Sequence, residues 1–433
     1  MHISREMAIH RLRLWWTRGS GRDLVISVIG FGSLFIALIF TIAPLFSDKQ
    51  QHYLLQDEQH HSPFLVDLTL LQNAHQKNAV CLDGSPAAYH FTKGFGSGSS
   101  SWIVHLEGGS WCSTVSSCIL RKSTALGSSD LMEKQKEFKG ILSNDASQNP
   151  DFFNWNKVKI RYCDGASFLG RDGNKNENKT GLFFRGQIIW ESIMEELLTR
   201  GLKDASQALL TGCSAGGLAT FFHCDSFHAL LPSVARVKCF SDGGYFLDSK
   251  DISGAMTIRS FYRDVIDLHD LEKILPRDCI ANKEASQCFF PQELIKFIDT
   301  PFLILNSAYD WWQIIHVLVA KKLNPGLLWE RCMTNIQSCS QDQIKIINGF
   351  RETLISTLRD FQHRKDSGLY INSCYQHCQA TSDLWHSLKI NNKSIAEAVG
   401  DWYLDRDEVK IIDCAYPCNP TCEHADLSLY KFN

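Results

Sequence analysis

The sequence predicts an α/β fold, in which a mostly parallel central sheet is covered by helices on both faces. Short apolar runs recur along the chain, and each ends near a glycine, asparagine or aspartate, as buried strands do. Longer amphipathic stretches lie between these runs, and strands that alternate with helices form parallel βαβ units. The hydrophobic share of 44% and the charged share of 21% are typical of a globular protein.

Five runs are the strand candidates, and one stretch is the clearest helix candidate. The runs cover residues 101–106, 158–162, 208–211, 237–240 and 301–305. Within residues 187–202, apolar side chains keep the three- and four-residue spacing of one helix face. Because no internal repeat interrupts this pattern, we expect one folded domain over residues 66–433.

The N-terminal 65 residues are predicted to lie outside that domain. Residues 1–23 are basic, with five arginines, and they precede an uncharged apolar run at 24–46. A run of about 20 apolar residues spans a bilayer, so this one is either a cleaved signal peptide or an uncleaved signal anchor. Its length, the basic arm before it and the lack of a small-x-small cleavage site favour the anchor. The mostly polar segment 47–65 is predicted to be a stem.

Sixteen cysteines, of which Cys81 is the first, indicate that the domain folds in an oxidising compartment. Their even number allows eight disulfides, although the pairing cannot be deduced from the sequence. Pairs close enough for local loops are Cys112/Cys118, Cys279/Cys288, Cys332/Cys339 and Cys374/Cys378. Because the spacings do not match the common C-x2-C zinc pairs, we expect disulfides and no metal.

Sequons and net charge indicate which partners to expect. Acceptor sequons at Asn178 and Asn392 predict glycosylation on surface loops of a lumenal protein. The net charge of −3 provides no basic field for a nucleic-acid backbone, so nucleic acid is excluded as a partner. The membrane is a partner only through residues 24–46, if that segment is uncleaved, and the domain is expected to be a monomer.

The sharpest motif is G-x-S-x-G at residues 212–216, which follows the strand candidate 208–211 and precedes an apolar helical stretch. In that context the motif is a nucleophile elbow, whose tight turn presents Ser214 as the attacking hydroxyl. The alternative is a glycine-rich turn with a solvated serine. We do not expect Cys213 to be the nucleophile, because an elbow directs that side chain elsewhere and a lumenal cysteine more often forms a disulfide.

A serine nucleophile needs donors for the oxyanion that forms on the substrate. The segment 107–111, EGGSW, follows the strand candidate 101–106 and provides backbone N–H groups at Gly109 and Ser110. With the N–H of Ala215, just after the nucleophile, they are the predicted oxyanion hole. A Gly-Gly pair taken alone is more often a plain turn.

The acid and the base are chosen by their position along the chain. Asp310 follows the strand candidate 301–305, where the acid of a Ser-Asp-His series is expected, while Asp242 after 237–240 is its rival. The histidine should come later still, and His377 lies between two cysteines that could fix its loop. The alternative is a surface histidine in a crosslinked loop.

With these motifs in place, the chain resembles the plant pectin acetylesterase family, which is similar to the animal carboxylesterases that remove a fatty acyl group from Wnt. The resemblance rests on LEGGSWC (106–112), NKVKIRYCDGASF (156–168), LFFRGQ (182–187), QALLTGCSAGGLATFFHCD (207–225), VKCFSDGGYF (237–246), CFFPQ (288–292), PFLILNSAYD (301–310), INSCYQHCQ (371–379) and AEAVGDWY (396–403). It implies an α/β-hydrolase fold with Ser214 as nucleophile, Asp310 rather than Asp242 as acid, and His377 as base.

The resemblance also implies the reaction and the location. The expected reaction is hydrolysis of O-acetyl esters on pectin through an acetyl-enzyme, without a cofactor, by a protein secreted to the cell wall or retained in the Golgi membrane by its anchor. Alternatives are a lumenal lipid or protein deacylase of the same fold and a catalytically silent wall-binding protein. Two departures bear on the substrate: Ser110 replaces the third glycine of the family's LEGGGWC, and the Trp-Trp pair at 311–312 is bulkier than usual.

Overall fold

The computed structural model describes residues 63–171, 180–320 and 328–428. The chain divides into the units Met1–Pro63 and Phe64–Asn433, and the elements below belong to the second unit. The predicted basic segment, the predicted anchor, nearly all of the predicted stem and the sequon at Asn178 lie outside the described residues. Within those residues, no helix has the length and apolar character needed to cross a membrane.

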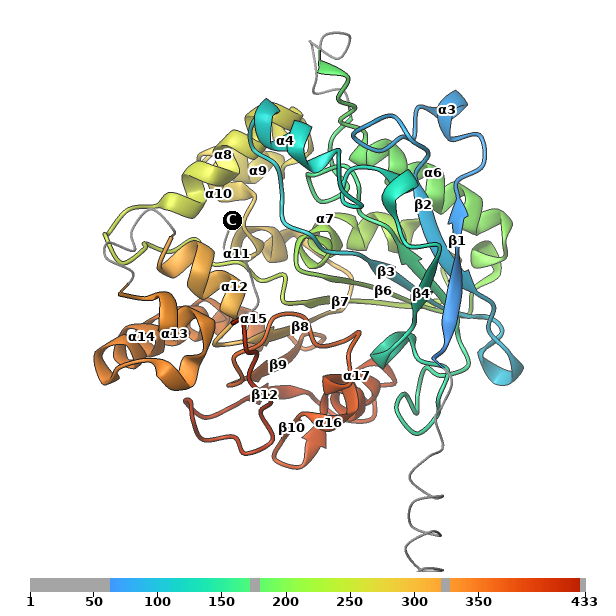
Figure 1. Ribbon diagram of the computed structural model, residues 1–433. Coiled ribbons are helices and arrows are strands. Elements are labelled where there is room, and N and C mark those ends of the chain that lie inside the picture. Colours follow the sequence, from blue (N-terminus) through green and yellow to red (C-terminus); the bar gives the residue numbers. More distant parts are fainter. Residues whose placement is uncertain (1–62, 172–179, 321–327, 429–433) are drawn as a thin grey trace, which may run out of the picture. The chain divides into compact units, whose positions relative to one another are not determined.

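The described part of the chain forms a mixed sheet of ten strands in the order β12-β9-β8-β7-β6-β3-β5-β2-β1-β4 (Figure 1). The neighbouring strands β12, β9, β8, β7, β6, β3 and β5 run parallel to one another, while β2, β1 and β4 are antiparallel at one edge. The bounds are β1 Leu65–Leu70, β2 Ala88–Thr92, β3 Ser101–Leu106, β4 Gln135–Glu137, β5 Asn156–Ile160, β6 Gln207–Cys213, β7 Arg236–Asp242, β8 Phe302–Ser307, β9 Gly368–Asn372 and β12 Lys410–Ile412. The prediction of a mostly parallel sheet is confirmed.

All five predicted strands are present, and one of them is displaced. The sequence predicts this strand over residues 158–162, but β5 covers Asn156–Ile160, two residues earlier. β10 (Lys389–Ile390) and β11 (Lys393–Ser394) form a separate two-stranded sheet.

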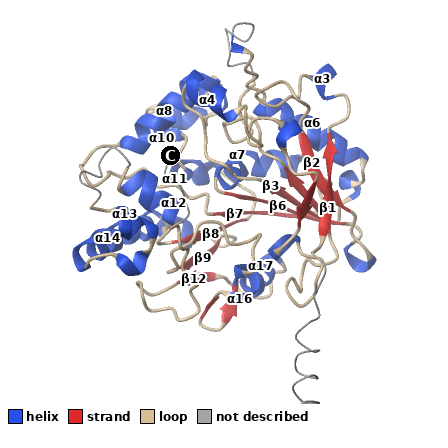
Figure 2. Cartoon of the chain, viewed as in Figure 1, coloured by secondary structure: helices blue, strands red, loops and turns tan. Residues whose placement is uncertain are grey.

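Helices cover both faces of the large sheet, as Figure 2 shows. The longer helices are α6 (Gly186–Thr199), α7 (Ala215–Ala229), α8 (Thr257–His269), α14 (Gln341–Thr357) and α17 (Ile395–Tyr403). The shorter helices are α3 (Ala74–Lys77), α4 (Val115–Arg121), α9 (Arg277–Ile280), α10 (Ala285–Cys288), α11 (Pro291–Leu294), α12 (Trp311–Gln313), α13 (Glu330–Thr334), α15 (Arg359–Gln362) and α16 (Leu384–Ser387).

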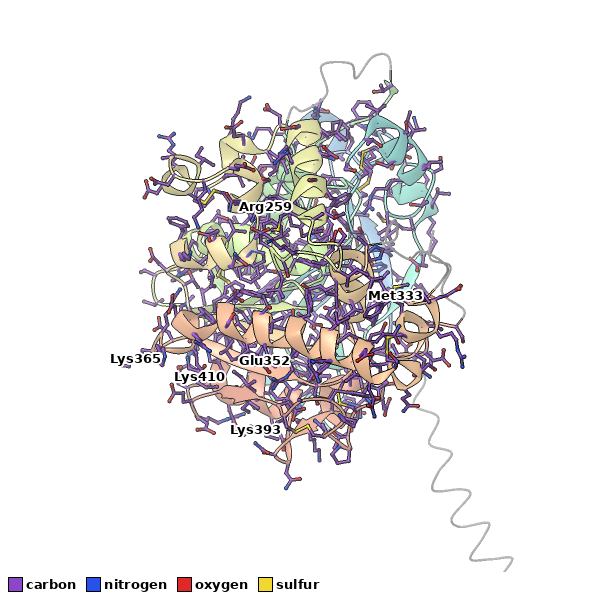
Figure 3. All side chains as sticks on the ribbon, turned by 90° about the vertical axis from the view of Figure 1, so that its left-hand side faces the viewer. Arg259, Met333, Glu352, Lys365, Lys393 and Lys410 are labelled. Carbon is purple, nitrogen blue, oxygen red and sulfur yellow. A yellow bond between two sulfur atoms is a disulfide. The ribbon has the colours of Figure 1, made fainter. Side chains whose placement is uncertain are left out.

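The alternation of side chains along β3 explains the two layers of helices. Val104 belongs to the core that contains Leu218 of α7, while its neighbour Ile103 belongs to the opposite core with Val399 of α17. Both faces of β3 are buried, and its centre is a run of consecutive apolar residues, Trp102 to Val104, as in strands of a parallel sheet. By contrast α14 runs along the surface, where Glu352 is exposed (Figure 3).

The predicted helix at 187–202 is shorter than expected. α6 ends at Thr199 because Gly201 adopts a left-handed φ of 116°, and a separate 3-10 turn then covers Leu202–Asp204.

All sixteen cysteines are paired in disulfides. The pairs are Cys81–Cys163, Cys112–Cys118, Cys213–Cys378, Cys224–Cys239, Cys279–Cys288, Cys332–Cys339, Cys374–Cys422 and Cys414–Cys418. Three of the four local candidates are confirmed, and the pair Cys374/Cys378 is wrong. Cys374 is buried in the core that also contains Trp385 of α16, whereas the chain turns at Cys378, with φ of 60°, toward the end of β6.

Candidate active site

Ser214 lies in a sharp turn between β6 and α7. Its φ of 57° and ψ of −121° are unusual for a residue other than glycine, and such strain is typical of functional positions. Gly216 makes the turn possible, because a Cβ on it would lie 2.1 Å from the carbonyl oxygen of Leu106. The Ser214 N–H donates to the carbonyl of Asp242 at 2.9 Å. The elbow geometry predicted from the motif is therefore present.

Asp310 follows β8 and caps the N-terminus of α12. Its Oδ1 accepts hydrogen bonds from the N–H groups of Trp312 at 2.9 Å and Gln313 at 3.2 Å. These two bonds fix the carboxylate, which is 1% exposed, so that Oδ2 faces the imidazole of His377.

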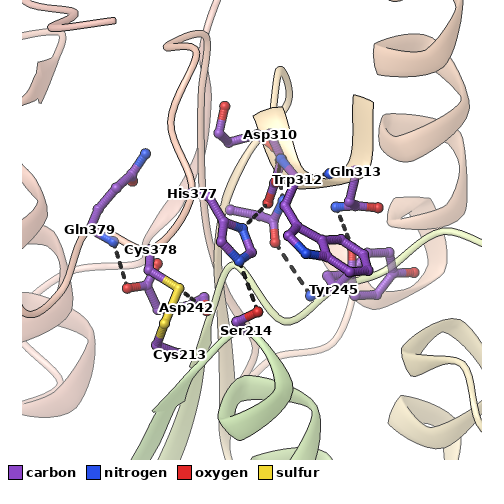
Figure 4. Close-up of polar contacts among 12 residues, drawn as sticks. Cys213, Ser214, Asp242, Tyr245, Asp310, Trp312, Gln313, His377, Cys378 and Gln379 are labelled. Atoms are coloured by element: carbon purple, nitrogen blue, oxygen red, sulfur yellow. Dashed lines mark hydrogen bonds and ion pairs between the residues drawn. A yellow bond between two sulfur atoms is a disulfide. The ribbon is translucent and has the colours of Figure 1, made fainter. Parts of the chain in front are cut away.

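His377 lies between Asp310 and Ser214, as Figure 4 shows. Its Nδ1 is 2.8 Å from Asp310 Oδ2, and its Nε2 is 2.8 Å from Ser214 Oγ. Because a carboxylate at Nδ1 holds the proton there, Nε2 is left to accept the proton of the serine hydroxyl. Trp311 and Trp312, the pair noted as bulky, enclose the ring with centroid distances of 5.3 and 6.2 Å.

The loop that carries His377 is attached to the elbow in two ways. The Cys213–Cys378 disulfide joins the residue before the serine to the residue after the histidine, with a Cα–Cα distance of 5.6 Å. The carboxylate of Asp242 also accepts the N–H groups of Gln379 at 2.6 Å and Ala380 at 2.7 Å. The expectation that Cys213 forms a disulfide is confirmed.

Asp242, the rival for the acid, therefore bonds to the backbone of the histidine loop, while Asp310 bonds to the ring. Burial is the main influence on Asp242 and raises its pKa to about 6, although its backbone hydrogen bonds act in the opposite direction. The sequence contains no signal for this role, because the two N–H groups come from residues 137 and 138 positions away.

The predicted oxyanion loop, residues 107–111, lies against the elbow. A Cβ on Gly108 would approach the Ser214 Cβ to 2.8 Å, so only glycine allows this contact. Gly109 has φ of 154°, and Ser110, which carries a Cβ, has φ of 58°. A left-handed conformation costs a residue with a Cβ about 1–2 kcal/mol. Among the described residues, none accepts a hydrogen bond from the Gly109 or Ser110 N–H.

A pocket of about 600 Å³ opens beside this loop. Its apolar wall consists of Trp111, Ile258, Phe261 and Trp312, and hydroxyl groups such as that of Ser110 add polar positions. Trp111 also donates from Nε1 to Ser167 Oγ at 2.7 Å, and Ser167 Oγ in turn donates to the Ala215 carbonyl at 2.8 Å. The pocket is thus built from the oxyanion loop, α8 and α12.

The second predicted sequon is accessible. Asn392 is exposed in the turn between β10 and β11, with φ of 65°. Its glycosylation stays a prediction.

Comparison with known proteins identifies relatives over the same region. The family model of pectinacetylesterases matches residues 59–423. Pectin acetylesterase 5 of Arabidopsis thaliana is 55% identical over 368 residues, which cover 84% of this chain and 86% of the relative. Pectin acetylesterase 4 of the same plant is 52% identical, with 83% and 88% covered. The palmitoleoyl-protein carboxylesterase notum1' of Xenopus laevis is 27% identical, with 83% and 75% covered.

A solved structure shows the same fold. The crystal structure of the Wnt deacylase Notum from Drosophila superposes with a TM-score of 0.70 at 24% identity, covering 83% of this chain and 99% of that one. This likeness shows an α/β-hydrolase fold for the described part of the chain, while the predicted transmembrane segment before it stays a prediction.

Proposed function

The chain belongs to the pectin acetylesterase family and is a carboxylic ester hydrolase, and on that premise we propose that it removes O-acetyl groups from the homogalacturonan of pectin. We assign Ser214 as nucleophile, His377 as base and Asp310 as the acid that orients the base. The observation that carries this proposal is the pair of 2.8 Å contacts that link the serine hydroxyl, the imidazole and the carboxylate in series.

In the first half of the reaction, Ser214 Oγ attacks the acetyl carbonyl carbon while His377 Nε2 takes the hydroxyl proton. The carbonyl π electrons move onto its oxygen, and the N–H groups of Gly109, Ser110 and Ala215 stabilise the resulting oxyanion. One such donor lowers the barrier by about 3 kcal/mol. When the tetrahedral intermediate collapses, the C–O bond to the sugar breaks, and Nε2 returns the proton to the departing sugar oxygen.

In the second half, water hydrolyses the acetyl-enzyme. Nε2 takes a proton from the water as its oxygen attacks the acetyl carbon, and then protonates Ser214 Oγ as acetate leaves. Asp310 keeps the proton of the neutral ring on Nδ1 throughout and stabilises the imidazolium that forms in each half.

We further propose that the enzyme acts in the secretory pathway or the plant cell wall. Eight disulfides support this location, because they persist in oxidising compartments. The uncharged run at 24–46 would either direct secretion or remain as a membrane anchor.

One observation favours a second candidate function. The 600 Å³ pocket with its apolar wall is larger than an acetyl group requires, as a deacylase for longer acyl chains would need. Rates on the p-nitrophenyl esters of acetate and octanoate separate the two functions. A higher kcat/KM on acetate supports the acetylesterase, and a higher value on octanoate supports the deacylase.

The direct test is acetate release from acetylated pectin by the full-length chain and by Ser214→Ala. The variant should retain the fold and lose acetate release, because no other group supplies the attacking oxygen. Ser226→Ala, on the exposed side of the same helix α7, is the matched control and should retain full activity. Acetate release by Ser214→Ala at the wild-type rate would contradict the proposal.

A further inference from the structure

Arg121, the last residue of α4, is attached to the oxyanion loop through the Gly109 carbonyl. Its Nη1 donates to that oxygen at 2.7 Å, and its Nε donates to the Leu126 carbonyl at 3.0 Å. The guanidinium also lies 4.8 Å from the centre of the Tyr162 ring, so three contacts fix its plane. The mechanism above does not use this side chain.

The hydrogen bond to Gly109 determines the direction of a different group. The Gly109 carbonyl and the Ser110 N–H belong to one planar trans peptide unit, so they point in opposite directions. When Arg121 holds the oxygen, the Ser110 N–H is aimed away from Arg121. Ser110 itself lines the 600 Å³ pocket, and Gly108 of the same loop lies against Ser214.

Without the hydrogen bond from Arg121, the peptide unit between Gly109 and Ser110 would be expected to rotate. Gly109 and Ser110 both have positive φ values, and Ser110 is strained in this conformation. Rotation of the peptide plane between them would replace an N–H donor by a carbonyl oxygen at the position of the developing oxyanion. The same rotation would therefore remove an attraction and add a repulsion.

Two other contacts support the same loop. Tyr162 Oη donates to the Ser110 carbonyl at 2.8 Å, and the Cys112–Cys118 disulfide joins the end of the loop to α4. Burial raises the pKa of Tyr162, so its hydroxyl stays protonated as a donor. The loop is thus held by α4 and by the segment after β5.

We propose that Arg121 is a positioning residue that aims the Ser110 N–H at the oxyanion by holding the Gly109 carbonyl. The inference rests on the proposed function of Ser214. Because the oxyanion exists only near the transition state, loss of Arg121 lowers kcat and leaves KM nearly unchanged.

The test compares Arg121→Ala with Lys122→Ala in the full-length chain, using p-nitrophenyl acetate. Lys122 is the adjacent cation, and its Nζ donates a hydrogen bond to the Gly181 carbonyl at 3.4 Å. Arg121→Ala should reduce kcat about 100- to 1,000-fold, the range found when one oxyanion donor is lost, with KM within about threefold. Lys122→Ala should match the wild type.

Chemical rescue separates positioning from general loss of structure. Millimolar ethylguanidinium should restore part of the kcat of Arg121→Ala and leave the wild type unchanged, because it can occupy the vacated site. If Arg121→Ala does not fold, Arg121→Lys replaces it; this variant keeps the charge and can make one of the two hydrogen bonds, so its kcat should be intermediate.

Wild-type kcat in either folded Arg121 variant overturns the inference, and so does an absence of rescue in a folded Arg121→Ala. The wild-type chain serves as the check on the proposed function. If it does not hydrolyse the ester, the function assignment fails, whereas an active wild type with an equally active variant overturns only the role of Arg121.

Discussion

Replacing Asp310 by asparagine tests the hydrogen-bond series at the site, and the structure predicts how the new side chain would orient. In the wild type, Oδ1 accepts two helix N–H groups, from Trp312 and Gln313. The asparagine oxygen must take that position, because an amide NH2 there would face two donors. The NH2 group then replaces Oδ2 and donates to Nδ1 of His377.

This orientation reverses the tautomer of the imidazole. When Nδ1 accepts, the ring proton moves to Nε2, which can then no longer accept the proton of Ser214. The same exchange in the Ser-His-Asp enzymes of the chymotrypsin class lowers kcat by about 10⁴, which is about 5.5 kcal/mol of barrier. Because asparagine is as good an N-cap as aspartate, the free energy of unfolding should change by less than about 1 kcal/mol.

The assay is kcat for acetate release, with thermal unfolding measured in parallel. Asp242→Asn is the matched control, since it changes the other buried carboxylate beside the histidine loop. Its amide oxygen can still accept hydrogen bonds from the Gln379 and Ala380 N–H groups, so kcat should stay within about tenfold of the wild type. This change is much smaller than the loss of about 10⁴ expected for Asp310→Asn. The reasoning is refuted if Asp310→Asn retains kcat within tenfold, or if Asp242→Asn is the more damaging change.

Three further predictions concern the loops around the site. Removal of the Cys213–Cys378 disulfide by alanine at both positions should lower kcat about 10- to 100-fold, because misplacement by about 1 Å can cost that much, while alanine at Cys279 and Cys288 should not. Equal losses in the two double variants would contradict a role in positioning. Ser110→Gly should raise the free energy of unfolding in urea by about 0.5–1 kcal/mol. Glycine removes the strain of a Cβ at positive φ, and this gain exceeds the entropy that glycine adds to the unfolded chain. A clear loss of stability would contradict the prediction. Burial raises the pKa of Asp242 to about 6 from 3.8, so its contribution to stability is fully present below pH 3.8 and is lost as pH rises through 6. As the pH falls from 7 to 4, the unfolding temperature of the wild type should therefore rise relative to that of Asp242→Asn. A difference that stays constant over this range would refute the raised pKa of Asp242.

The parts of the fold that were predicted from sequence depend on local patterns. The strand at 101–106 and the elbow at 212–216 are encoded by consecutive residues, so the apolar run or the glycine spacing was sufficient. β9 was missed because its five residues, GLYIN, contain a glycine and an asparagine, although the sheet buries all of them. β4 was missed because its three polar residues lie at the edge of the sheet, where no apolar pattern is needed.

The parts that were not predicted depend on contacts between distant residues. The partner of Cys378 is 165 positions away, so the nearby Cys374 was the better guess from spacing alone. Asp242 ends one buried parallel strand and Asp310 follows the next, and only the course of the histidine loop determines which carboxylate meets the ring. The contact between Arg121 and Gly109 likewise has no sequence motif, because it depends on how α4 packs after the oxyanion loop.

The most direct test of the central claim is to map the residue that a fluorophosphonate probe modifies in the full-length chain. The phosphorus should bond to Ser214 Oγ with one adduct per chain, and His377→Ala should suppress the reaction. An adduct on any other residue, or an unmodified Ser214 in protein that releases acetate from pectin, would contradict the account.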